Sequence, residues 1–137
     1  MNIKITGTGS YSPEIIHDNY KFLDRNFFDN EGNRIETKNE EIIEKFQKIT
    51  GIRERRYAKD ELNTSDIAYL AAKEAIINSK VDPEKIDYII LAHNFGNANN
   101  DSTQVDVFPG LAVRVKNLLK IKNPKCVAYD ILLCLLY

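Results

Sequence analysis

The stretch IDYIILAHNFGNANNDSTQVDVFPGLAVRVKNLLKIKNPKCVAYDI, residues 86–131, decides the fold. It opens with a continuous apolar run at 86–92, typical of a buried strand, and continues into an asparagine-rich loop at 93–106. Apolar residues then recur at helical spacing over 108–119, and a second strand pattern follows at 126–131. A strand, a helix and a strand in this order nearly always form a parallel pair with a right-handed crossover. The sequence therefore predicts an α/β fold.

Both strands are expected to end at the same edge of the sheet, where open α/β folds bind their ligands. Two side chains able to do chemistry lie near this edge, His93 and Cys134. Cys134 is either a nucleophile, conceivably paired with His93, or an ordinary apolar residue among its leucine neighbours. A histidine at a strand end is more often a loop residue hydrogen-bonded to the backbone. The residues themselves leave both alternatives open.

Two more helices are predicted upstream of this unit. Apolar residues recur at helical spacing over 42–49, and Gly51 stands where a left-handed C-cap is wanted. A second helix is expected to take its N-cap from 64–66 and to end near Ser79. Its small-residue stripe would permit close packing against a sheet or another helix. The stripe consists of Ala68, Ala71, Ala72 and Ala75.

Shorter patterns connect and precede these helices. Residues 52–58 are expected to be extended, and Asp82-Pro83 predicts a brief helical turn. Residues 3–6 alternate, which predicts a short strand leading into a tight turn at Gly7-Thr-Gly9. Residues 19–28 permit a short helix, and the polar residues after it predict a loop.

Composition limits the function classes. The chain has 137 residues, 43% hydrophobic and 28% charged, which is typical of one globular domain rather than a disordered chain. A formal net charge of -1 gives no field that would attract nucleic acid without sequence preference. Two cysteines do not form a disulfide framework, and no apolar run predicts a signal peptide or a membrane span. We therefore expect a cytoplasmic protein that binds neither nucleic acid nor membrane.

Four short stretches resemble a known enzyme family. They are ITGTGSY at 5–11, TGIRER at 50–55, VFPG at 107–110 and AYD at 128–130. Their order and approximate spacing are similar to those of the N-terminal half of a β-ketoacyl-acyl-carrier-protein synthase III (3-oxoacyl-ACP synthase III), a thiolase-like condensing enzyme. The resemblance covers residues 1–137 as one truncated domain, and it implies a mixed, mostly parallel sheet flanked by helices.

The resemblance also implies an activity, an acyltransferase reaction in fatty-acid or related polyketide biosynthesis. A cysteine at a helix N-terminus would take an acyl group from acyl-CoA as a thioester, and malonyl-acyl-carrier protein would supply the attacking carbanion. Coenzyme A is then a substrate, and neither a cofactor nor a metal is implied. The resemblance also implies a homodimer when the protein is full length. The family's catalytic His and Asn come from the C-terminal half and have no counterpart in this chain, so we expect the chain to be inactive alone.

By resemblance, four residues of this chain correspond to site residues of the family, and one of the four is out of register. Thr50 and Arg53 match substrate-binding positions, and Phe108 matches a residue that reaches the partner's acyl pocket. Cys134 is the catalytic candidate, but it lies four residues after Asp130 where the family has five. A slip of one residue redirects a side chain, which suggests a chain broken or shifted in frame just before the nucleophile.

Two further positions depart from the family. Ile49 replaces an arginine that helps to hold coenzyme A, and Lys45 replaces a frequent stacking tryptophan. Arg53, Arg55 and Arg56 either meet a phosphate or an acidic carrier protein, or they lie on a solvated strand with paired charges. The alternative function is a non-catalytic α/β module that binds an acyl carrier protein or a partner subunit.

Overall fold

A computed structural model describes residues 3–98, 105, 106 and 108–132. These residues form two compact units, one made of the N-terminal residues up to Tyr11 with the chain from Asp60 onward, the other of Ser12–Lys59. Each unit is described separately. That residues 1–137 make up one domain stays a prediction.

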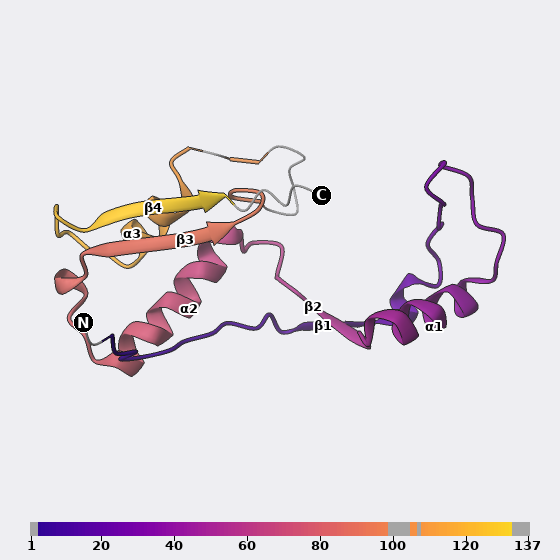
Figure 1. Ribbon diagram of the computed structural model, residues 1–137, viewed down its shortest axis with the longest axis horizontal. Helices are drawn as coiled ribbons and strands as arrows, with labels where there is room; N and C mark the ends of the chain where they lie inside the picture. Colours follow the sequence, from indigo (N-terminus) through magenta and orange to yellow (C-terminus); the bar gives the residue numbers. More distant parts are fainter. Residues whose placement is uncertain (1–2, 99–104, 107, 133–137) are drawn as a thin grey trace. The chain divides into compact units, whose positions relative to one another are not determined.

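The first unit contains the predicted strand–helix–strand. Strands β3 (Tyr88–His93) and β4 (Val127–Leu132) pair in parallel, with Tyr88 opposite Val127 and His93 opposite Leu132. Helix α3 (Leu111–Leu118) lies between them in the chain and packs on both. Figure 1 shows the two strands side by side and pointing the same way. The α/β class and the parallel pair are confirmed.

The sheet has one covered and one bare face. Alternate residues Ile89, Leu91 and Ala128 are partly buried on the side of α3, where Leu111, Ala112 and Val115 form the core. The opposite face carries exposed apolar side chains, and the rings of Tyr88 and Tyr129 stack there with centroids 6.1 Å apart. We call this the bare face; it consists of Tyr88, Ile90, Val127, Tyr129 and Ile131.

Helix α2 (Thr64–Ser79) has the predicted length but a different cap. Asn63, not a residue of 64–66, is the N-cap, and its side chain accepts a hydrogen bond from the backbone N–H of Asp66. The carboxylate of Asp66 accepts in return from the backbone N–H of Asn63 at 3.0 Å, which completes a capping box. The prediction was off by one because cap-forming residue types fill four consecutive positions.

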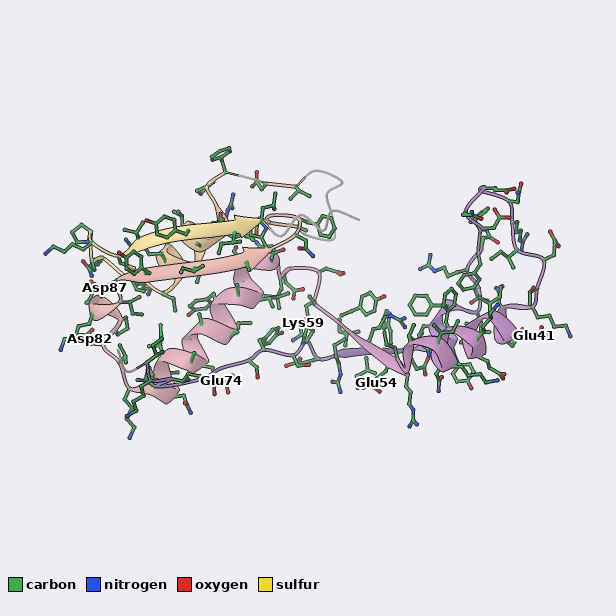
Figure 2. The ribbon with its side chains drawn as sticks, in the orientation of Figure 1. Glu41, Glu54, Lys59, Glu74, Asp82 and Asp87 are labelled. Carbon is green, nitrogen blue, oxygen red and sulfur yellow. The ribbon has the colours of Figure 1, made fainter. Side chains whose placement is uncertain are left out.

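The N-terminal residues do not form the predicted strand and turn. Residues 3–11 lie along α2 without strand pairing, and Ile3 and Ile5 are exposed. The backbone N–H of Ser10 donates to Oε2 of Glu74 at 2.8 Å, and that glutamate lies beside the segment in Figure 2. The pattern was misleading because a strand needs a ladder partner, and β3 and β4 pair only with each other among the described residues.

The two glycines of this segment serve close packing. A Cβ at Gly7 would lie 2.6 Å from the Cβ of Ser79, and one at Gly9 would collide with backbone atoms of Ala71 and Ala75. The small-residue stripe of α2 therefore lets a backbone approach closely, as predicted, but its partner here is an extended segment. Helix α3 also packs on α2.

The second unit pairs β1 (Ile15–Asp18) with β2 (Glu54–Tyr57) antiparallel, with His17 opposite Arg55. Between them lie a 3-10 turn, η1 (Asn19–Phe22), and helix α1 (Asn39–Thr50), which ends at Gly51 with φ 70° as predicted. The short helix permitted over 19–28 is thus only its first turn. The described strands form two separate pairs rather than one mixed sheet.

Two smaller elements follow the predictions. Asp82-Pro83 opens the 3-10 turn η2 (Pro83–Lys85), and the carboxylate of Asp82 accepts from the N–H of Glu84. In the loop after η1, the carboxylate of Asp29 accepts from the backbone N–H groups of Glu31 and Asn33. Within the part of the chain that the structure describes, no helix is long and apolar enough to cross a membrane.

Candidate active site

The carboxyl ends of β3 and β4 border a small cavity of about 150 Å³. Both strands contribute, because their parallel register brings His93 and Leu132 to the same edge. The start of α3 and the loop after β3 contribute further lining residues. The lining residues are His93, Gly96, Asp106, Leu111, Asp130 and Leu132. The edge at which the sequence predicts the site therefore borders a small cavity, and its role as a site stays a prediction.

Asp130 joins β4 to the N-terminus of α3. Its Oδ1 accepts a hydrogen bond from the backbone N–H of Ala112 at 2.6 Å. The N-cap residue of α3 is Gly110, which has no side chain to satisfy the free N–H groups of the first turn. A Cβ at Gly110 would collide with Oδ2 of Asp130. The glycine thus makes room for a carboxylate from the neighbouring strand, and that carboxylate replaces the missing cap.

His93 at the end of β3 bonds to its own loop. Its Nδ1 accepts from the backbone N–H of Gly96 at 2.9 Å, so Nε2 is the nitrogen left to carry the proton in the neutral ring. Gly96 has φ 75°, a left-handed conformation that favours glycine. This geometry matches the interpretation of His93 as a loop residue hydrogen-bonded to backbone.

The loop after β3 is anchored to the start of α2. Oδ1 of the buried Asn97 accepts from the backbone N–H of Ser65 at 3.0 Å. The N–H of Ala98 donates to Oγ1 of Thr64 at 3.1 Å, and the N–H of Thr64 donates back to the carbonyl of Ala98. Residues 97 and 98 are therefore held against the start of α2, and the neighbouring Gly96 lines the cavity.

Phe108 is held by its backbone while its ring stands in solvent. Arg114 donates to the carbonyl oxygens of Phe108 and Pro109, each at 2.8 Å, and forms an ion pair with Asp106 at 3.2 Å. The Phe108 residue is 87% exposed, and its peptide bond to Pro109 is cis. A large apolar side chain thus points into solvent from a backbone that Arg114 holds in place.

Cys134 lies outside the described residues, so its role and its pairing with His93 both stay predictions. The described part of β4 ends at Leu132 on the rim of the cavity, two residues before the cysteine. Cys126, by contrast, is buried at the start of β4. Among the residues placed by the structure, no group of His, Cys, Asp or Glu could hold a metal ion.

The other two predicted site residues lie in the second unit. Oγ1 of Thr50, at the end of α1, donates to the carbonyl of Phe46 at 2.7 Å and accepts from the N–H of Ile52 at 3.2 Å. Arg53 is exposed, and its side chain makes no hydrogen bond or ion pair with any described residue. Thr50 thus shapes the turn that precedes the exposed Arg53.

The three neighbouring arginines are not equivalent. Arg56 pairs with Glu54 at 3.3 Å on the exposed side of β2, as expected for a solvated strand. Arg55 is partly buried and bonds to Asn19. Arg53 alone of the three is unengaged with the described residues. The interpretation as a solvated strand with paired charges therefore fits Arg56, whereas binding of a phosphate or an acidic carrier protein stays open for Arg53.

Lys45 and Ile49, the two departures noted in the sequence, line one groove on α1. Its volume is about 470 Å³, and Ile49 is largely exposed in it. The other lining residues are Ile35, Thr37, Glu41, Ile42 and Phe46. The two side chains thus lie on one surface of α1.

Known proteins similar to this chain include several β-ketoacyl-acyl-carrier-protein synthases III. A β-ketoacyl-[acyl-carrier-protein] synthase III of Staphylococcus aureus (strain Newman) is 44% identical over 92 residues, which are 67% of this chain and 25% of the relative. The 3-oxoacyl-[acyl-carrier-protein] synthase III of Aquifex aeolicus superposes with TM-score 0.64 at 32% identity, over 93% of this chain and 34% of that one. The Thermus thermophilus synthase III superposes with TM-score 0.64 at 27% identity, over 93% of this chain and 32% of that one. No family model matches.

The chain matches an N-terminal portion of a β-ketoacyl-acyl-carrier-protein synthase III. The predicted thiolase-like fold is confirmed by these superpositions. The match spans about a quarter of the length of the curated synthase III relatives.

Several residues of the site escaped the sequence analysis. Asp130 was noted only within the AYD stretch and as the reference position for Cys134, and Gly110 only as part of VFPG. The close contact between them joins segments distant in the sequence, so no local pattern reveals it. The sequence analysis did not predict the hydrogen bonds from Arg114 to the carbonyl oxygens of Phe108 and Pro109, nor, in the second unit, the burial of Asn19. One signal was available: a helix that begins after Pro-Gly has no side-chain cap of its own, which calls for an acceptor from elsewhere.

Proposed function

We propose that this chain is the N-terminal part of an acyltransferase that condenses an acyl-CoA primer with malonyl-acyl-carrier protein in fatty-acid or related polyketide biosynthesis. The observation that carries the proposal is the 44% identity to the S. aureus synthase III over 92 residues. The cavity at the β3–β4 edge lies where an α/β fold would place such a reaction.

In this proposal a cysteine thiolate attacks the thioester carbonyl of acyl-CoA. A sulfur–carbon bond forms, the bond to coenzyme A breaks, and the coenzyme leaves as a thiol after taking up a proton. Malonyl-carrier protein then loses CO₂, and the electron pair left on its methylene carbon attacks the acyl-cysteine carbonyl, which expels the cysteine thiolate. Cys134 is the candidate in this chain for the first step.

The described residues support parts of this scheme. Asp130 ties β4 to α3 and so fixes the strand that leads to Cys134. The exposed guanidinium of Arg53 suits a phosphate of coenzyme A or an acidic carrier protein, and Thr50 shapes the turn just before it. The outward ring of Phe108 suits a homodimer in which it enters the partner's acyl pocket. We assign the protein to the cytoplasm, with coenzyme A as substrate and no cofactor.

We further propose that the chain alone does not turn over. The family's His and Asn, which stabilise the developing charges, have no counterpart in this sequence, and loss of such groups removes most of the rate enhancement. Cys134 also lies one residue closer to Asp130 than the family's nucleophile does, which is a second reason to expect no turnover.

The test is an assay of the purified chain with labelled acyl-CoA and malonyl-carrier protein, alongside Cys134→Ser and the control Cys126→Ser. We expect no condensation product from any of the three. Steady turnover that Cys134→Ser abolishes and Cys126→Ser spares would contradict the inactivity. If the chain binds carrier protein without any acyl transfer, even after joining to the C-terminal part of a synthase III, the non-catalytic module is the better function.

A further inference from the structure

The second unit contains an apolar pocket that the proposed condensation does not use. Its volume is about 300 Å³, within the range of sites for small molecules. Four aromatic rings make up most of the wall, together with one guanidinium and one amide. The lining residues are Asn19, Phe22, Phe27, Ile43, Phe46, Arg55 and Tyr57. Only Phe46 is shared with the groove at Lys45 and Ile49.

The guanidinium of Arg55 is fixed in this pocket from two sides. Nη1 donates to Oδ1 of Asn19 at 2.8 Å, and the guanidinium carbon lies 5.4 Å from the centre of the Phe22 ring. Asn19 is itself buried, and its amide nitrogen donates to the carbonyl of Ile52 at 2.8 Å and to Gln47 at 3.3 Å. Arg55 is thus held in place before any ligand arrives, so little rotamer entropy remains to be lost on binding.

The charge of Arg55 has no carboxylate partner among the described residues. Neighbouring cations of the same unit do have one: Arg56 pairs with Glu54, and Lys59 pairs with Glu14. Nε and Nη2 of Arg55 make no hydrogen bond to the described chain, which leaves one edge of the guanidinium fork open. A partly buried charge beside apolar walls gains strongly from an anionic acceptor.

We propose that this pocket, here called the Arg55 pocket, binds a small monocarboxylate with an aromatic or branched apolar body. The single positive charge and the open fork match one carboxylate, whose two oxygens accept in parallel. The rings of Phe22, Phe27 and Phe46 would cover the apolar body, and aromatic contacts favour a ring in the ligand. The proposal uses none of the residues assigned to the thioester chemistry, so it stands or fails independently of the proposed function.

The test is ligand-observed NMR on the full chain with phenylacetate as probe and 2-phenylethanol as the neutral analogue. The matched variants are Arg55→Gln and Arg56→Gln, since these neighbours on β2 lie on opposite faces. We expect saturable phenylacetate binding, at least tenfold tighter than that of the alcohol. Arg55→Gln should weaken it about tenfold to a hundredfold, and Arg56→Gln by less than twofold.

A third variant keeps the test decisive if Arg55→Gln misfolds. Arg55→Lys keeps the charge without the fork, and it should show intermediate affinity if the site selects a carboxylate. If Arg55→Gln does not fold, the preference of the unmodified chain for phenylacetate over the alcohol, together with Arg55→Lys, decides the question. Absence of saturable binding, equal binding of the alcohol, or equal losses in Arg55→Gln and Arg56→Gln would each overturn the proposal.

Discussion

The two faces of the β3–β4 sheet are both apolar but differ in what covers them. Alternate residues of the same strands face either α3 or the bare face. The covered side has its helix within the same strand–helix–strand stretch, whereas no described element lies over the bare face. Parallel sheets are ordinarily covered on both sides. The strand–helix–strand stretch therefore covers only one side of its own sheet, and covering the other side needs a partner from elsewhere.

The largest expected effect is on the covered face. Leu111 is 2% exposed, and Leu111→Ala should lower the free energy of unfolding by about 3 kcal/mol, because it removes buried methyl groups and leaves a cavity. The measurement is urea unfolding followed by circular dichroism at low protein concentration.

The matched control for this change is Ile90→Ala. Ile90, on the bare face, is 63% exposed, so the change should alter the free energy of unfolding by less than about 0.5 kcal/mol. Equal losses for the two variants would mean that the two faces are covered alike.

A smaller effect concerns the link between β4 and α3. Asp130→Ala removes the acceptor for the N–H of Ala112 and should cost about 1 kcal/mol of unfolding free energy, in the range of a lost N-cap. Asp130→Asn keeps an oxygen acceptor but loses the charge at the helix N-terminus, so it should fall between the native protein and Asp130→Ala. An unchanged stability in Asp130→Ala would show that the carboxylate does not cap α3.

The smallest effect lies in the loop of the second unit. The backbone N–H of Asn33 donates to the carboxylate of Asp29 and lowers its pKa from the ordinary value of 3.8. Because the folded pKa is depressed, the associated stability is present above the unfolded pKa and is lost as the pH falls through the folded pKa. An NMR titration should give Asp29 a pKa below 3.8, and Asn33→Pro, which removes the N–H, should raise it. A pKa at or above 3.8 in the native protein would contradict this.

The sequence analysis succeeded where structure depends on nearby residues. The strand–helix–strand, the left-handed cap at Gly51 and the turn at Asp82-Pro83 follow from periodicity and from residue types with fixed backbone preferences. It failed over residues 3–6, because a strand depends on a partner that alternation does not reveal. Strand β1 was missed for the same reason: its four residues gain their structure by pairing with β2, far along the chain.

The sequence predicts the sheet edge where the candidate site lies, but it does not predict the contacts that hold functional side chains in place. The shared edge of β3 and β4 follows from parallel connection, and His93 lies on it. The dependence of Gly110 on Asp130, and of Arg55 on Asn19, arises from contacts between distant segments that carry no local pattern. The family resemblance located Thr50, Arg53 and Phe108, whose roles stay proposals.

The central claim is that the bare face is an exposed apolar surface that associates with another protein surface. Analytical ultracentrifugation of the full chain tests it most directly, with the double variant Ile90→Lys/Tyr129→Lys and, as control, Ile77→Lys on an exposed position of α2. Exposed apolar patches drive association. We predict that the native chain and Ile77→Lys sediment as oligomers or aggregates and that the double variant sediments as a smaller species. A native chain that sediments as a single monomer, or a double variant with an unchanged distribution, would contradict the account.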